Sequence, residues 1–307
     1  MGHTRRELTR FGALIGQKTA KEGRYQASRG PLARLASSAM ATVLQTSDPA
    51  SRGTRIKGFV ALTKPRIIEL LLVETVPAMI VAKRGWPGLW LIIATVIGGT
   101  LAAGGANAVN MYVDRDIDAI MDRTKGRPLV TGVVQPTEAL VFALALEAIA
   151  FVFLWYFVNL ISAVLAVSAM LFYVFVYTLW LKRRSTSNIV IGGAAGAVPV
   201  LVGWTAVTGS LDLTVGRNWA PIVLFAIIFY WTPPHFWALA IKYKDDYAAA
   251  DVPMLPAVAD LATVTRRIVG YTVLLWALTL VFGPVADMGM IYLVSAAVLG
   301  AVFLGYA

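Results

Sequence analysis

Hydrophobic residues along this chain come in long blocks that contain no Asp, Glu, Lys or Arg. The blocks free of these four residue types are 85–113, 148–181, 185–211, 218–241, 268–286 and 288–307. A helix needs about 20 consecutive apolar residues to cross the hydrocarbon core of a bilayer. The pattern therefore predicts an all-α polytopic membrane protein.

Polar and turn-forming residues divide the apolar sequence into eight expected spans. The spans are 67–83, 88–112, 138–158, 160–181, 188–207, 219–241, 268–285 and 288–306. The short junctions at Asn159 and around Pro284 force the helices on either side of each junction to run antiparallel. We expect residues 57–307 to form one transmembrane domain, and the polar, basic tail 1–56 to be disordered.

Composition supports a membrane protein and excludes several classes of function. Of the 307 residues, 58% are hydrophobic and only 14% are charged. A soluble domain is nearer half apolar and a quarter charged, so a soluble enzyme or a secreted module is excluded. The chain has no Cys, which excludes disulfides, zinc–thiolate sites and cysteine nucleophiles.

Positive charge is concentrated on one expected face of the membrane. Of the 27 Lys and Arg residues, 24 fall in segments expected on that face, namely 1–66, 113–137, 182–184 and 242–267. The other face carries Lys83, Arg84 and Arg217. Lys and Arg mark cytoplasmic loops, so we expect the N-terminus and both long loops in the cytoplasm, beside a bacterial plasma membrane. A mitochondrial inner membrane is the alternative, because the tail is rich in Arg. The net charge of +10 does not indicate nucleic acid, since a basic segment beside a membrane usually meets anionic lipid.

An acidic cluster begins where the second expected span ends. Asn110, Asp114, Asp118 and Asp122 are spaced by four, so on a continued helix they share one face. Stacked carboxylates repel one another without a cation, and Mg²⁺ is usually held by a few carboxylates plus substrate phosphate oxygens. Bases that suit phosphate are interleaved with the acids: Arg115, Arg123, Lys125 and Arg127. The cluster predicts a Mg²⁺–diphosphate site, and the alternative is a solvated loop of local ion pairs.

A second cluster of acids and bases follows the sixth span, on the same expected face. Its members include Lys242, Lys244, Asp246 and Tyr247. The two clusters could close around one phosphorylated head group and leave its apolar tail between the helices; a generic basic loop is the alternative.

One of the two histidines of the chain, His235, lies inside the sixth span among Trp231, Phe236 and Trp237. The neighbouring pair Pro233 and Pro234 is expected to break the helix beside a cavity. The imidazole could touch a porphyrin, ligate its iron, carry a proton or simply pack.

Three acids lie inside expected spans, where ionisable groups are functional candidates. Glu69 is three residues from Arg66 and is expected to pair with it. Glu74 and Glu147 are expected to have a function, or to be protonated or hydrogen-bonded between helices. The small residues 192–197 predict close contact with another helix.

At the two clusters the sequence resembles the UbiA superfamily of intramembrane prenyltransferases, and more specifically its heme-farnesylating branch. The matching segments are 62–66, 110–128, 182–204 and 232–256, within a likeness that covers 57–307. The Asn-x3-Asp-x3-Asp element is typical of the superfamily, whereas the Thr-Pro-Pro-His-Phe-Trp run is specific to the branch. The resemblance implies a UbiA-type transmembrane helix bundle of nine spans around a lipid-accessible cavity. Eight spans are visible, and the chain stops at Ala307 directly after an apolar run, so we expect a truncated C-terminus.

The resemblance also implies a reaction: farnesyl diphosphate and heme B give heme O, with Mg²⁺ as cofactor. It implies Mg²⁺ ligation by Asn110, Asp114, Asp118 and Asp246, which would also be catalytic together with Arg123, Arg127 and Lys242. Residues expected at the substrates are His235, Lys244, Arg66, Tyr247, Trp237 and Glu69. The second loop departs from the family pattern, because Ala250 rather than an acid stands four residues after Asp246. Expected partners are the lipid bilayer and heme A synthase or terminal oxidase assembly factors, and no nucleic acid.

Other functions remain open at the level of sequence. A relative that prenylates an aromatic or quinone precursor is the main alternative, and the His235 segment argues against it. A transporter or channel is expected to carry acids near the midplane, whereas here they cluster at one face. An assembly or structural protein is the last alternative.

Overall fold

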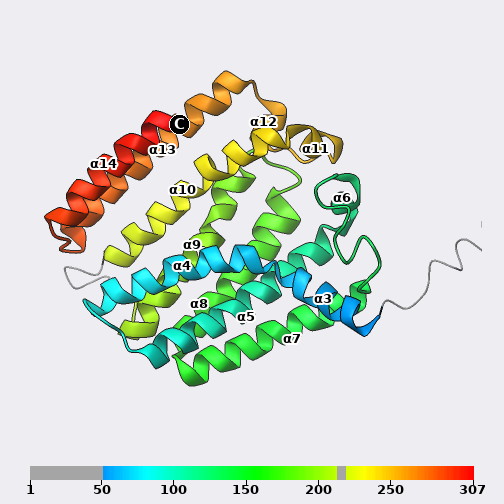
Figure 1. Cartoon of the computed structure of the whole chain (residues 1–307), viewed down its shortest axis with the longest axis horizontal. Coiled ribbons are helices and arrows are strands. Elements are labelled where there is room, and N and C mark those ends of the chain that lie inside the picture. Colours follow the sequence, from blue (N-terminus) through cyan, green and yellow to red (C-terminus); the bar gives the residue numbers. More distant parts are fainter. Residues whose placement is uncertain (1–50, 213–218) are drawn as a thin grey trace, which may run out of the picture. The chain divides into compact units, whose positions relative to one another are not determined.

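The computed structural model describes residues 51–212 and 219–307. The disorder predicted for the tail falls almost entirely outside the described residues, as does Arg217. The described residues form helices and loops and contain no strand, which confirms the all-α prediction (Figure 1).

Each of the eight expected spans corresponds to a long helical element. These elements are α4 (Pro65–Lys83), α5 (Leu89–Val113), α7 (Pro136–Phe157), α8 (Leu160–Leu171) continued by the π-helix η1 (Phe172–Leu181), α9 (Asn188–Thr208), α10 (Ala220–Lys242), α13 (Leu261–Val285) and α14 (Met290–Tyr306). Four shorter helices precede the first span or lie in the long loops: α3 (Arg52–Thr63), α6 (Arg115–Ile120), α11 (Lys244–Ala249) and α12 (Leu255–Val258).

Six of the described helical segments are long and apolar enough to cross a membrane. The apolar helix α14 is shorter, with 17 residues, and α4 carries four charged residues within its 19. The protein is therefore a multi-pass membrane protein. The tight turn before α8 depends on Asn159, whose side chain accepts a hydrogen bond from the backbone N–H of Ser162 at 2.8 Å and caps the new helix.

Helix α9 packs against α4, α8 and α10, as its small residues predicted. A Cβ added at Gly193 would lie 3.0 Å from the Thr232 side chain of α10. A Cβ added at Gly203 would lie 2.5 Å from the backbone oxygen of Thr75 in α4. Small residues therefore let α9 approach two neighbouring helices closely.

Helix α10 is not broken at its proline pair, contrary to the sequence-based expectation. The helix runs without interruption from Ala220 to Lys242 and contains both Pro233 and Pro234. Membrane helices tolerate proline where side chains and neighbouring helices satisfy the freed backbone groups. The two prolines free the carbonyls of Phe229 and Tyr230, four residues earlier. Just before them, the hydroxyl of Thr232 donates a hydrogen bond to the Ile228 carbonyl at 3.0 Å.

Candidate functional site

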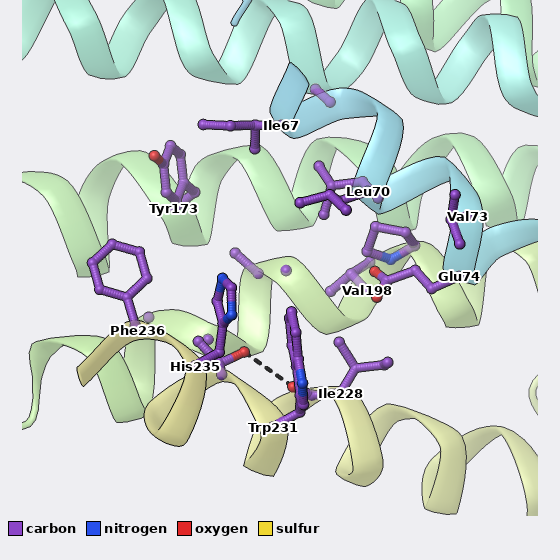
Figure 2. Close-up of a pocket in the computed structure, with 18 of the residues that line it drawn as sticks. Ile67, Leu70, Val73, Glu74, Tyr173, Val198, Ile228, Trp231, His235 and Phe236 are labelled. Atoms are coloured by element: carbon purple, nitrogen blue, oxygen red, sulfur yellow. Dashed lines mark hydrogen bonds between the residues drawn. The ribbon is translucent and has the colours of Figure 1, made fainter. Parts of the chain in front are cut away.

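A cavity of about 1310 Å³ lies between the helices. Residues from α4, α5, η1, α9, α10, α13 and α14 line it. Figure 2 shows its apolar section, where Ile67, Leu70 and Val73 of α4 lie across from Ile228 and Trp231 of α10. The cavity can therefore take a large apolar molecule.

Charged and polar side chains gather at one end of this cavity, and we call this end the polar mouth. The polar mouth consists of Lys64, Arg66, Asn110, Asp118, Arg123, Arg127, Lys182 and Tyr247. These residues come from the start of α4 and the residue before it, the end of α5, α6, the loop after α6, the residue that follows η1, and α11. An anionic head group at the polar mouth would leave its apolar tail in the cavity.

The first acidic cluster forms a row of three side chains rather than four. Backbone N–H groups of Asp114 and Asp118 donate to the carbonyls four residues earlier, each at 2.9 Å. This keeps Asn110, Asp114 and Asp118 on one face across the α5–α6 junction. Helix α6 ends at Ile120, so Asp122 leaves the row; its side chain is 81% exposed and pairs with Lys125.

Each acid of this row is paired with a cation. Asp114 is fully buried, accepts a hydrogen bond from Asn110 Nδ2 at 2.7 Å and forms an ion pair with Lys182. Asp118 is also buried and binds Arg127 at 2.5 Å. The row is thus enclosed on two sides by cations that a phosphate could also bind.

Lys64 adds a third cation to the polar mouth. Its ammonium donates to Asn110 Oδ1 at 2.7 Å. Burial, with the nearby charges of Arg127 and Lys182, lowers the pKa of Lys64 to about 7. A bound anion would favour the charged form of this lysine, so the polar mouth is suited to a multiply charged anion.

Asp116 lies on the opposite face of α6 from this row. Its two carboxylate oxygens accept hydrogen bonds from Arg183 at 2.6 and 2.7 Å. These bonds lower the pKa of Asp116 to about 2. Asp116 is exposed, so it serves as an internal comparison for the enclosed acids.

The second loop meets the first through Asp246. Its carboxylate accepts a hydrogen bond from the backbone N–H of Arg123 at 3.3 Å. Lys242 and Asp246 line a smaller pocket of about 500 Å³ together with Arg123. Tyr247 is buried beside the main cavity, and this burial raises its pKa. Lys244 is exposed and lines neither pocket.

Besides Lys244, two more residues expected at the substrates, Trp237 and Glu69, are not at the cavity. Trp237 is fully buried in a core cluster with Leu255 and Val264. Glu69 is exposed, and in the part of the chain that the structure describes it makes no ion pair with Arg66. The sequence could not separate these residues from their cavity-lining neighbours, because an apolar helix gives no sign of which face is packed.

The intramembrane acids differ in their surroundings. Glu74 lines the cavity, and its Oε1 is buried without a hydrogen-bond partner among the described residues. Glu147 is buried in α7 away from the cavity, against Gly105 of α5. Its carboxylate oxygens also lack a partner within the described chain. The structure therefore places only Glu74 where it can meet a ligand.

Sequence reasoning did not assign a role to Lys64, Lys182 or Thr178. Thr178 accepts a hydrogen bond from Asn110 Nδ2 at 3.2 Å, so η1 holds the row of acids from the side. Lys64 and Lys182 could have been found from the sequence, because both stand at the ends of expected spans, on the same side of the membrane as the acids.

The first-loop residues offer oxygen donors for a metal ion. Asp114 Oδ1 is buried and has no hydrogen-bond partner among the described residues, and Asn110 and Asp118 share its helix face. Oxygen donors of this kind fit Mg²⁺. Within residues 51–212 and 219–307, no three His, Asp or Glu side chains gather into a metal site. Joint ligation by Asp246 stays a prediction.

Comparison with known proteins places the chain in a family. The model of the UbiA prenyltransferase family matches residues 71–307. A protoheme IX farnesyltransferase of Parafrankia sp. (strain EAN1pec) is 60% identical over 253 residues, which is 82% of this chain and 79% of the relative. The enzyme of the same name from Streptomyces coelicolor is 51% identical over 267 residues, 86% of this chain and 83% of the relative.

Two solved structures share the fold. A UbiA homolog from Archaeoglobus fulgidus, bound to GPP and Mg²⁺, has a TM-score of 0.63 at 16% identity and covers 81% of this chain and 85% of its own. The apo structure of a UbiA homolog from Aeropyrum pernix K1 has a TM-score of 0.63 at 22% identity, with coverages of 76% and 86%.

Proposed function

Because the chain belongs to the UbiA prenyltransferase family, we propose that it transfers the farnesyl group of farnesyl diphosphate to a vinyl group of protoheme IX (heme B), giving heme O. The observation that carries this function is the identity of 51–60% to enzymes named protoheme IX farnesyltransferase, across more than four-fifths of the chain. The same identity favours this reaction over prenylation of an aromatic or quinone precursor.

The geometry suits substrates with one charged end and large apolar parts. The diphosphate binds at the polar mouth, where Lys64, Arg127 and Lys182 neutralise its charge. The farnesyl chain and the porphyrin occupy the apolar cavity of about 1310 Å³. Holding both reactants there replaces an encounter between two molecules by a step within one complex.

Mg²⁺ fits the first-loop donors, and we propose Asn110, Asp114 and Asp118 as its ligands, with Asp246 from the second loop. The ion supplies positive charge that stabilises the departing diphosphate. The cations already paired with Asp114 and Asp118 are within reach of the same diphosphate. In a Mg²⁺–diphosphate complex, the metal ion would therefore balance the carboxylates, and the diphosphate would balance the lysine and arginine side chains.

The bond changes define what the protein has to do. The bond between the farnesyl C1 and the diphosphate oxygen breaks, and its electron pair leaves with the diphosphate. The terminal vinyl carbon then bonds to C1, which leaves a positive charge on the carbon attached to the porphyrin. Water adds to this carbon and loses one proton. Electrostatic stabilisation at the polar mouth lowers the barrier of the first step.

We place the polar mouth on the cytoplasmic face of a plasma membrane. The segments rich in Lys and Arg lie at the same end of the helices as the polar mouth, and such segments mark the cytoplasmic side. Farnesyl diphosphate would reach it from the cytoplasm. Since heme O is the precursor of heme A, we propose heme A synthase or terminal oxidase assembly factors as partners.

The test is conversion of heme B by the purified protein in lipid vesicles. Mass analysis of the pigment is expected to show heme O with farnesyl diphosphate and Mg²⁺, and none after chelation of divalent cations. Prenylation of an aromatic acid with no reaction on heme would instead establish the alternative substrate class.

A further inference from the structure

We infer that His235 accepts the proton from the water molecule that adds to the farnesylated vinyl group. This inference rests on the proposed function and assigns a catalytic residue to its last step. The proton released in that step needs an acceptor inside a cavity that is mostly apolar. Away from the polar mouth, the described cavity lining offers two side chains that can accept a proton, His235 and Glu74.

Position along the helices favours His235. The farnesyl C1 is bonded to the diphosphate, so the new carbon–carbon bond forms just below the polar mouth. His235 is seven residues, about 10 Å, from the end of α10 at Lys242, which is followed by α11 with Tyr247 of the polar mouth. Glu74 is ten residues from Lys64, about 15 Å along α4. Figure 2 shows the His235 ring in the cavity, with Glu74 on the far side of Trp231. His235 is therefore nearer to the reacting carbons.

The contacts of the ring suit a proton acceptor. Its face stacks on the Trp231 indole, with ring centroids 4.3 Å apart and an interplanar angle of 16°. An indole face attracts a cation, so the stack stabilises the imidazolium that forms when the ring takes up a proton. The stack also leaves the edge of the ring, which carries both nitrogens, open to the cavity.

The same contacts argue against a ligand of the heme iron. A metal-bound histidine almost always donates its second ring N–H to a carboxylate or a carbonyl. Within the part of the chain that the structure describes, neither nitrogen of His235 has a hydrogen-bond partner. Iron ligation is also not needed for chemistry at a vinyl group on the porphyrin edge.

The step balances without a further reactant. The water oxygen forms a bond to the carbon that carries the positive charge, and one water proton moves to a ring nitrogen of His235. The imidazolium later releases this proton to solvent. Without the acceptor, the same cation can lose a proton from a neighbouring carbon instead, which gives an alkene lighter than heme O by one water.

The experiment compares products and diphosphate release in His235→Gln, His235→Glu and Glu74→Gln, each reconstituted in vesicles with heme B, farnesyl diphosphate and Mg²⁺. His235→Gln is expected to release diphosphate, while the ratio of heme O to the dehydrated product falls roughly 100-fold. His235→Glu restores an acceptor and is expected to recover part of the ratio. Glu74→Gln is expected to keep the wild-type ratio.

Several outcomes would overturn the inference. One is an unchanged product ratio in His235→Gln, including the case in which heme binds more weakly but heme O remains the sole product. A second is the same ratio of heme O to dehydrated product in His235→Gln and His235→Glu. A third is a change of this ratio in Glu74→Gln. Loss of diphosphate release in both His235 variants would show that this residue acts before water adds. A wild-type protein that does not convert heme B would instead refute the proposed function.

Discussion

Asp114 combines three features of the candidate site: burial, an ion pair and an oxygen atom that is not hydrogen-bonded. It is fully buried, one of its oxygens is held by Lys182 and Asn110, and the other has no partner among the described residues. A buried carboxylate in this position is stable only with its cation. Its other oxygen has no partner among the described residues, so the carboxylate can keep this charge pair and still offer an oxygen to the proposed Mg²⁺.

Asp114→Asn is expected to lower kcat by roughly 100-fold or more, because it removes charge that positions the diphosphate for departure. Production of heme O from heme B by the protein in vesicles measures the effect. The matched control is Asp116→Asn. Asp116 is an exposed acid two residues further along, in α6; it pairs with Arg183, and its variant should keep turnover within a few-fold of wild type. Undiminished turnover in Asp114→Asn would remove this residue from the mechanism.

The ion pair between Asp114 and Lys182 also has a consequence for stability. Lys182→Met leaves a buried carboxylate without its cation, which costs about 3–5 kcal/mol. The double variant with Asp114→Leu removes both charges and is expected to be more stable than Lys182→Met alone. Thermal unfolding in detergent measures both, with the exposed neighbour Arg184→Met as control. If the double variant were less stable than Lys182→Met, the pair would not be a coupled buried pair.

Among the helices, α9 shows how small residues fix the position of two neighbours. Gly203 lies against the backbone of Thr75, so an added methyl group has to push α4 away. Gly203→Ala is expected to lower stability by about 1–3 kcal/mol. Gly196→Ala on the same helix is the control, because no atom lies within 4 Å of its added Cβ. Equal melting temperatures for the two variants would contradict close packing of α4 on α9.

The sequence predicted the helices well because length and apolarity determine a membrane span. It predicted the faces of these helices less well. The spacing of Asn110, Asp114 and Asp118 was informative, since polar residues mark one face of an apolar helix. Trp231 and Trp237 could not be told apart, because α10 is apolar on all sides and only packing shows that the first meets the cavity. The partner of Asp114 is 68 residues away along the chain, and nothing local predicts it.

At the scale of the whole transmembrane unit, the start of α4, the first long loop and the turn after η1 supply the charged residues of the polar mouth, and the second long loop supplies Tyr247. The absence of cysteine makes the orientation of this mouth easy to measure. Thr131→Cys in the first long loop is expected to react with an impermeant maleimide in inside-out vesicles. Ser210→Cys, in the loop between α9 and α10, is expected to react in right-side-out vesicles. The reverse pattern would place the polar mouth on the outer face.

The last helix, α14, has no buried residue, yet Tyr292, Leu299 and Phe303 on it line the cavity. Other side chains on it are exposed and apolar, among them Ile291, Val294 and Val298, and such side chains suit contact with lipid acyl chains. One wall of the cavity is therefore also a surface that suits the bilayer, so we expect the packing of the surrounding lipid to influence the shape of the cavity.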